Sequence, residues 1–163
     1  MFINRWKWSI LTLFMMGVLF ISSNTPYQEQ DMKPFFKDFI TITETNLPPI
    51  EFTYDHSLVT PTKPYDYVEF FIRKAAHVAS FGLLAILSIL AFKEFRRTRP
   101  LLLGAALTLS YALFDEFHQS WIQGRTGHLI DVFVPDTLGI LLALLGFKLI
   151  ELIRLSNKKN PRF

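Results

Sequence analysis

Seven polar or charged side chains interrupt a mostly apolar stretch in the second half of the chain. They lie between Tyr111 and Gly139, and they are Asp115, Glu116, His118, Gln119, Arg125, Asp131 and Asp136. Ionisable groups are costly in a sequence apolar enough to enter a bilayer, so they mark candidate functional positions. A histidine beside carboxylates can act as a general base, and a guanidinium can hold a phosphate.

Helical spacing brings several of these side chains to one face. Asp115, His118 and Gln119 follow Tyr111 at positions that share one side of a helix. Glu116 lies about 60° around the same helix from Gln119. Lipid cannot satisfy such a face, so it should turn toward other helices.

A second polar group stands before the central apolar segment. Arg73 and Lys74 lie one helical turn before His77. A cation from this group next to a carboxylate of the first group would offset part of the cost of burying both. The predicted pairs are Arg73 or Lys74 with Asp115 or Glu116, and Arg125 with Asp131.

The elements that must position these residues are predicted to be membrane helices. Half of the 163 residues are hydrophobic and the mean hydropathy is positive, which is typical of a small polytopic membrane protein. We predict an all-α membrane helix bundle with about four transmembrane helices, forming one domain over residues 1–163. The predicted spans are 6–23, 75–92, 101–122 and 132–150, with an extracytoplasmic loop over 24–72.

Two details of this arrangement follow from local composition. The first span is predicted to be a retained anchor rather than a cleaved signal peptide, because no small-residue cleavage site precedes the polar segment. A short amphipathic helix around Lys33 to Ile40 is expected to lie on the membrane surface. The chain has no cysteine, which excludes a disulfide framework and a thiolate metal site.

The distribution of charge predicts the orientation. The segment 24–72 has three basic residues (Lys33, Lys37, Lys63) and eight acidic ones (Glu29, Asp31, Asp38, Glu44, Glu51, Asp55, Asp66, Glu69). The segment 93–99 is basic through Lys93, Arg96, Arg97 and Arg99, and the tail is basic through Lys148, Arg154, Lys158, Lys159 and Arg162. The positive-inside rule therefore places both termini in the cytoplasm and the polar groups at the outer leaflet. No nucleic-acid partner is needed to explain the positive charge.

Three blocks of residues resemble the VanZ-like family of small bacterial integral membrane proteins. The first, ISSNTPYQEQD over 21–31, is similar to a Ser-Ser-x-x-Pro-Tyr-x-x-Gln opening. The second is Arg73-Lys74-Ala-Ala-His77. The most specific is Asp115-Glu116-Phe-His118-Gln119, followed by Gly124-Arg125 and Asp131. The blocks cover nearly the whole chain in the expected order.

Two positions depart from the family pattern. Ser80 and Phe81 stand where the family often has Glu and Tyr, so no role of those groups carries over. The family's last acidic pair is usually four residues apart, whereas Asp131 and Asp136 are five apart with Pro135 between them. Five residues turn an α-helix by about 140° beyond a full turn, so Asp136 joins the polar groups only if the helix starts late or Pro135 shifts it. Asp131 is the stronger site prediction of the two.

The resemblance implies a role in resistance to teicoplanin-type glycopeptide and lipoglycopeptide antibiotics, without an established reaction. Those drugs act on lipid-linked cell-wall precursors at the outer face of the bacterial plasma membrane, which is where the orientation places the polar groups. The expected partners are membrane lipids or a lipid-linked cell-wall precursor, and no protein partner is assigned. Most members of the family lie outside resistance clusters, so an ordinary envelope task is equally compatible with the resemblance.

Several chemistries remain open. Binding of an anionic headgroup would use Arg73, Lys74 and Arg125. A membrane hydrolase or transferase acting on a lipid-linked phosphate would take its catalytic groups from Asp115, Glu116, His118 and His77. A divalent metal could draw on His77, Asp115, His118 and Asp131, but no zinc-enzyme spacing is present, so neither a metal nor a cofactor is assigned. The fourth possibility is an interhelical polar clamp in a structural subunit of an envelope complex.

The ligand-binding residues predicted from the sequence are Arg73, Lys74, His77, Asp115, Glu116, His118, Gln119, Arg125 and Asp131. His56 and His128 are expected to be loop residues, because no carboxylate stands at a spacing that would orient either ring. Gly104 is expected to mark a close contact between helices.

Overall fold

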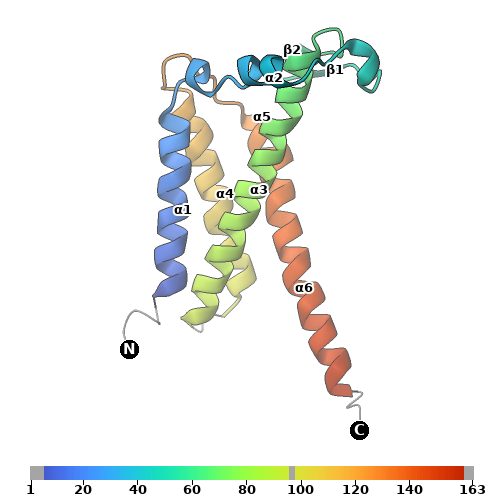
Figure 1. Ribbon diagram of the computed structural model, residues 1–163. Helices are drawn as coiled ribbons and strands as arrows, with labels where there is room; N and C mark the ends of the chain where they lie inside the picture. The colour runs from blue at the N-terminus through green and yellow to red at the C-terminus, as the bar shows by residue number, and fades with distance from the viewer. Residues whose placement is uncertain (1–5, 96–97, 160–163) are drawn as a thin grey trace.

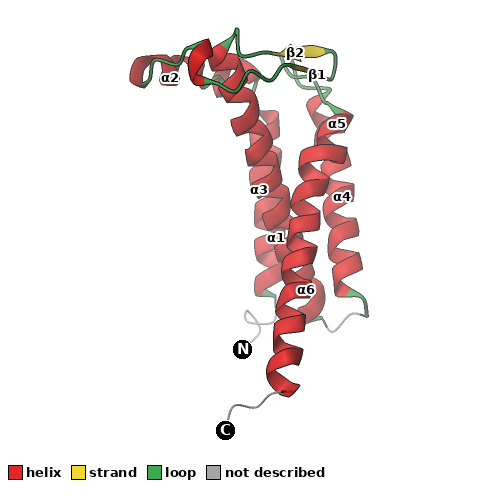
Figure 2. Cartoon of the chain, turned by 90° about the vertical axis from the view of Figure 1, so that its right-hand side faces the viewer, coloured by secondary structure: helices red, strands yellow, loops and turns green. Residues whose placement is uncertain are grey.

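The computed structural model describes residues 6–95 and 98–159, and its framework is a bundle of four long helices (Figure 1). They are α1 (Lys7–Asn24), α3 (Pro64–Glu94), α4 (Pro100–Gln119) and α6 (Thr137–Lys159). Connecting segments cover one end of the bundle, which we call the loop-capped end, and α6 leans away from the other helices toward the opposite end (Figures 1 and 2). Arg96, Arg97 and Arg162 of the predicted basic segments lie outside the described residues.

Three of the described helices, α1, α3 and α4, are long and apolar enough to cross a membrane. The prediction of an all-α membrane helix bundle is confirmed. α6 has 23 residues and carries Lys148, Glu151 and Arg154 within its sequence. The fourth span over 132–150 therefore stays a prediction, since it rests on this more charged helix.

The helix starts follow from proline. Pro64 and Pro100 are the first residues of α3 and α4, where a missing N–H costs nothing and the fixed φ suits a helix. α3 thus begins well before the predicted span at residue 75 and takes in the last part of the predicted loop. This early start places Glu69 on the same helix as Arg73, one turn away.

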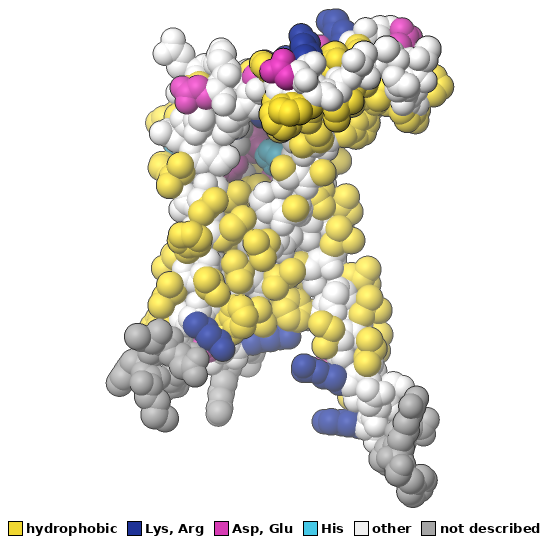
Figure 3. Space-filling view, viewed as in Figure 1, with side chains coloured by type: hydrophobic (Ala, Val, Ile, Leu, Met, Phe, Trp, Pro, Cys, Tyr) yellow, Lys and Arg dark blue, Asp and Glu magenta, His cyan; other side chains and the backbone are white. Residues whose placement is uncertain are grey.

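The segment between α1 and α3 forms short elements that lie across the loop-capped end (Figure 2). They are η2 (Tyr27–Gln30), α2 (Lys33–Phe39), η3 (Glu44–Asn46), β1 (Phe52–Tyr54) and β2 (Ser57–Val59). The predicted helix around 33–40 is confirmed as α2. Phe35, Phe39 and Ile40 are exposed there. Part of this segment projects beyond the helices as an overhang, and hydrophobic side chains cover its underside (Figure 3).

The strands β1 and β2 form an antiparallel hairpin that the sequence pattern did not predict. Phe52 pairs with Val59 and Tyr54 with Ser57. The two turn residues, Asp55 and His56, both have positive φ, at 44° and 66°. Two successive residues of positive φ are typical of the tight turns that suit the twist of a hairpin, and Asp and His enter this region more readily than most residues.

Two apolar clusters hold the bundle together. The one nearer the loop-capped end joins α3, α4 and the start of the last helical segment, and its buried members are Phe81, Leu84, Tyr111, Ala112 and Val132, with α1 residues packed on it. The second consists of Ala85, Ile140 and Ala143. Phe81, Leu84 and Ala85 are the members of these clusters on α3, and they define the side of α3 that packs against the other helices.

Glycines allow α3 to approach its neighbours closely. A Cβ on Gly104 of α4 would lie 2.8 Å from the Cα of Ile89, so the predicted close contact at Gly104 is confirmed. A Cβ on Gly139 of α6 would lie 2.8 Å from the backbone nitrogen of Gly82. Small residues at such crossings are common where membrane helices pack through their backbones.

Candidate functional site

A polar cavity of about 340 Å³ lies at the loop-capped end. Its wall comes from the end of α1, the first half of α3, the last turn of α4 and the loop that follows α4. A hollow containing histidine and acidic side chains is visible beneath the overhang (Figure 3). Seven of the nine residues predicted to bind a ligand line the cavity, namely Arg73, Lys74, His77, Asp115, Gln119, Arg125 and Asp131.

Arg125 ties the loop after α4 to the end of α1. Its Nε donates to the carbonyl of Thr25 at 2.8 Å, and its Nη2 donates to the carbonyl of Ser22 at 2.9 Å. Its Nη1 donates to Oε1 of Gln119 at 3.1 Å, and a further hydrogen bond reaches the side chain of Gln30. Burial lowers the pKa of the Arg125 guanidinium, but an arginine side chain stays protonated at physiological pH. The guanidinium therefore places a charge in the cavity wall and clamps three segments.

Arg73 forms a second clamp on the same wall. Its Nη2 and Nε donate to Oε1 of Glu69 at 2.8 and 3.1 Å, and its Nη2 also donates to the carbonyl of Gln30 at 2.8 Å. Tyr27 donates its hydroxyl to Oε2 of Glu69 at 3.0 Å, and the guanidinium carbon lies 4.5 Å from the centre of the Tyr27 ring. Glu69 is only 2% exposed. From the sequence, Glu69 is predicted to be one of the acidic residues of the loop over 24–72. That prediction does not include the early start of α3 at Pro64.

Lys74 pairs with Asp131. Its Nζ lies 2.5 and 2.7 Å from the two carboxylate oxygens, and Tyr54 of the hairpin donates to Oδ1 of Asp131 at 2.5 Å. Burial first, and then the hydrogen bond to Asp131, raise the pKa of Tyr54, so the hydroxyl keeps the proton that it donates.

The ion pairs predicted from the sequence are therefore wrong. Among the described residues, the carboxylate partner of Arg73 is Glu69 and that of Lys74 is Asp131, while Arg125 has no carboxylate partner. The cause is geometric, since the early start of α3 supplies Glu69 and the turn before α6 brings Asp131 to Lys74.

Asp115 links α4 to α1. Ser23 donates its hydroxyl to Oδ1, and Gln119 donates from Nε2 to Oδ2 at 2.7 Å. Asp115 is 4% exposed and both of its oxygens have partners. Its environment is that of a satisfied structural carboxylate that also borders the cavity.

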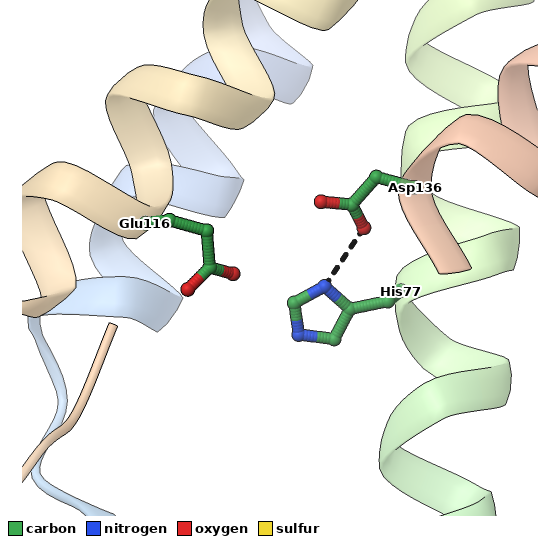
Figure 4. A group of neighbouring side chains, drawn as sticks. All are labelled: His77, Glu116 and Asp136. Carbon is green, nitrogen blue, oxygen red and sulfur yellow. Dashed lines mark hydrogen bonds and ion pairs between the residues drawn. The ribbon is translucent and has the colours of Figure 1, made fainter. Parts of the chain in front are cut away.

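His77, Glu116 and Asp136 form a tight cluster contributed by α3, α4 and the segment before α6 (Figure 4). Nδ1 of His77 lies 2.9 Å from Oδ1 of Asp136. Each residue offers one atom able to bind a metal, and these three atoms lie within 4.8 Å of one another. Oε2 of Glu116 accepts a hydrogen bond from the backbone N–H of His128 at 2.7 Å.

Asp136 lies in the polar end together with Asp131, as the sequence allowed if Pro135 shifts the helix. Both are buried and both point into the polar end, and Asp136 is 0% exposed. The short helix α5 (Leu129–Asp131) is followed by one π-helical turn, η4 (Val132–Asp136), which contains Pro135. A π-turn closes its hydrogen bonds five residues apart, so residues with that spacing stack above one another. Because of this wider turn, Asp136 is not rotated by about 140° away from Asp131, as it would be in a regular α-helix.

His118 does not line the cavity. Its ring lies against two aromatic rings, with centroids 4.5 Å from Phe20 and 6.0 Å from Phe114. Its Nδ1 is buried and has no hydrogen-bond partner among the residues that the structure describes. No described carboxylate orients this ring, so His77 is the better candidate for acid–base chemistry.

His128 has a partner that sequence spacing could not reveal. Its Nδ1 contacts the carboxylate of Asp55 at the tip of the hairpin, so the expectation that no carboxylate orients His128 is wrong. A Cβ on the preceding Gly127 would collide with the carbonyl oxygen of Glu116. This glycine lets the loop come close enough for His128 to reach Glu116.

The composition of the wall determines what the cavity can bind. It contains three permanent cations and two carboxylates, which are Arg73, Lys74, Arg125, Asp115 and Asp131. The cations are held in place by partners, so an anionic group entering the cavity would meet fixed donors rather than mobile side chains. Beside this wall, the cluster around His77 offers one imidazole and two carboxylates.

Comparison with known proteins gives one family. A family model described as VanZ/LLP1 matches residues 8–151, which is most of the chain. Neither the comparison with curated proteins nor the comparison with solved structures gives a match.

Proposed function

The chain belongs to the VanZ/LLP1 family, and from this premise we propose that its polar cavity binds the phosphate-bearing headgroup of a lipid-linked component of the bacterial cell envelope. The observation that carries the proposal is the meeting of Arg73, Lys74 and Arg125 in the wall of one cavity. Arg73 and Lys74 each pair with one carboxylate, whereas Arg125 has no carboxylate partner among the described residues, which leaves its charge available to an anion. Arginine forks suit phosphate oxygens, and lysine adds a point charge.

The proposed location is a bacterial plasma membrane, with α1, α3, α4 and α6 all spanning it. Lys and Arg side chains gather at the end opposite the loops (Figure 3). Lys93 lies at the end of α3, Arg99 precedes α4, and Lys148 and Arg154 lie in the second half of α6. By the positive-inside rule this end is cytoplasmic, as are both termini. The cavity then opens near the outer leaflet, where lipid-linked wall precursors are exposed.

We propose that occupation of this cavity lowers sensitivity to teicoplanin and related lipoglycopeptides. The support is the family membership together with the outward position of the cavity. A protein that holds the headgroup of a lipid-linked precursor would compete with a drug that recognises the same lipid-linked molecule.

The test is complementation of a deletion strain, with teicoplanin sensitivity as the readout. The critical variant is the double change Lys74→Gln with Asp131→Asn, which removes the lysine donor together with the carboxylate that pairs with it and so leaves no buried unpaired charge. The matched control is Lys63→Gln, which removes an exposed lysine just before α3. The proposal expects the parent and the control to protect, and the double variant to lose protection several-fold at equal membrane abundance. Full protection by the double variant would contradict it.

A second candidate is a membrane hydrolase or transferase acting on a lipid-linked phosphate. It is favoured by one observation, the hydrogen bond between His77 and the fully buried Asp136, because such a carboxylate can hold a histidine in one tautomer for proton transfer. Conversion of a labelled polyprenyl pyrophosphate by the parent and not by Asp136→Asn would favour this candidate over simple binding.

A further inference from the structure

We propose that His77, Glu116 and Asp136 bind one divalent transition-metal ion, of the Zn²⁺ or Mn²⁺ type. The three residues come from α3, α4 and η4, and their ligand atoms lie within 4.8 Å of one another (Figure 4). This site is separate from the clamps of Arg73 and Arg125 and does not depend on headgroup binding.

The first argument is that two buried carboxylate oxygens point into the cluster without partners. Oε1 of Glu116 and Oδ2 of Asp136 have no hydrogen-bond partner among residues 6–95 and 98–159. Glu116 is 2% exposed and Asp136 is 0% exposed. A buried carboxylate oxygen left without a donor is costly, whereas a cation between the two would satisfy both.

The second argument concerns charge. Within the described part of the chain, neither Glu116 nor Asp136 forms an ion pair with a lysine or an arginine, because Lys74 is committed to Asp131 and Arg73 to Glu69. His77 is therefore the one basic side chain in the cluster for these two buried carboxylates. A divalent ion would neutralise both, and buried charges are normally paired or bound to metals.

The third argument is ligand chemistry. One imidazole with two carboxylates is a set that suits Zn²⁺ or Mn²⁺, whereas Ca²⁺ and Mg²⁺ favour all-oxygen surroundings. Ligand atoms about 2.0 to 2.2 Å from one tetrahedral Zn²⁺ lie about 3.3 to 3.6 Å apart. A pair of these atoms at the 4.8 Å limit would therefore have to close by a little over about 1 Å through side-chain rotation.

The surroundings hold the ligands and leave one side accessible. The backbone N–H of His128 fixes Oε2 of Glu116, and the π-turn with Pro135 directs Asp136 inward. His77 borders the polar cavity and is 22% exposed. Three protein ligands would leave coordination positions free, as in zinc enzymes, and His77 is the ligand that borders the cavity.

The experiment measures metal binding by the full chain purified in detergent and freed of metal. Titration with Zn²⁺ and Mn²⁺ gives stoichiometry and affinity, and Co²⁺ serves as a spectroscopic probe of a nitrogen and oxygen ligand set. The ligand variants are Glu116→Gln and Asp136→Asn, which keep shape and remove charge. The matched control is Asp115→Asn, because Asp115 is an equally buried carboxylate beside Glu116 whose oxygens already have donors.

The proposal expects one ion per chain for the parent and for Asp115→Asn, with affinities within about twofold of each other. Each ligand variant should bind at least about tenfold more weakly, since even changes behind the ligands cost about 10–100-fold. Absence of saturable binding to the parent would overturn the proposal without any variant, as would equal losses in Asp115→Asn and the ligand variants. The metal titration is done without a lipid-linked phosphate. Its outcome therefore does not depend on whether the cavity binds a headgroup.

Discussion

At the residue scale, Arg125 connects three segments of the polar end. Its guanidinium holds the end of α1, the segment η2 and the last turn of α4 through Ser22, Thr25, Gln30 and Gln119. Hydrogen bonds from a charged donor stabilise more than neutral ones, and interhelical contacts of this kind fix register. The same side chain thus supplies both a cavity charge and much of the local rigidity.

Replacement of Arg125 should therefore lower stability as well as remove charge. We expect Arg125→Gln to cost about 2–4 kcal/mol, because several carbonyl groups lose their donor together. At about 2–4 °C per kcal/mol for a chain of this size, the melting temperature in detergent should fall by about 5–15 °C. Arg99→Gln, which removes an exposed arginine at the opposite end, is the control. A melting temperature within a degree of the parent's would show that the clamp contributes nothing.

The charged residues of the cavity wall followed from the sequence, whereas their partners did not. Ionisable types in apolar surroundings are conspicuous in any sequence, which is why Arg73, Lys74 and Asp131 could be selected. Pairing depends on contacts between segments far apart in the chain, such as Lys74 with Asp131 or His128 with Asp55. No local spacing encodes such contacts.

At the scale of elements, the π-turn η4 and the hairpin decide how the polar end is assembled. The π-turn brings Asp136 to His77, and the hairpin brings Tyr54 to Asp131. Helical periodicity assumes a constant 3.6 residues per turn, so by itself it does not bring Asp136 to the side of Asp131. The hairpin strands have three residues each, too few to give a clear alternating pattern. The long apolar helices, by contrast, were predicted from hydropathy alone.

The approach of α3 and α6 should depend on glycine at one position of α6 and not at another. We expect Gly139→Ala to cost about 1–3 kcal/mol, because its Cβ would collide with the carbonyl oxygen of Val78 and with the backbone of Gly82. Gly146→Ala on the same helix meets nothing within 4 Å and should be neutral or stabilising, since alanine favours helix by up to about 1 kcal/mol. Melting temperatures of the two variants in detergent make the comparison. Equal effects would contradict the close crossing.

At the scale of the whole molecule, the two ends of the bundle differ in charge and covering. One end carries the loops, the cavity and most acidic residues, and the other carries Lys93, Arg99 and the basic part of α6 (Figures 1 and 3). This asymmetry was readable from the sequence, because it needs only the order of charged and apolar segments. The account of function requires the cavity end to face outward.

Single cysteines can test that orientation, since the chain has none of its own. Ser57→Cys lies exposed on the hairpin, and Ser156→Cys lies exposed near the end of α6. We expect a membrane-impermeant maleimide to label the first in intact cells and the second only after the membrane is opened. Labelling of both cysteines in intact cells would place both sites outside. An even number of crossings would then separate them, instead of the three that the proposed topology requires.

The most direct measurement of the central claim is binding of a polyprenyl pyrophosphate to the full chain in lipid nanodiscs. We expect saturable binding of the pyrophosphate that the corresponding uncharged polyprenol does not displace. The double variant Lys74→Gln with Asp131→Asn should weaken binding by about tenfold or more, since one charge-assisted contact contributes about 1.5–3 kcal/mol and about 1.4 kcal/mol is tenfold. The Lys63→Gln control should bind as the parent does. Absence of saturable binding, or equal affinity of the double variant and the parent, would contradict the account.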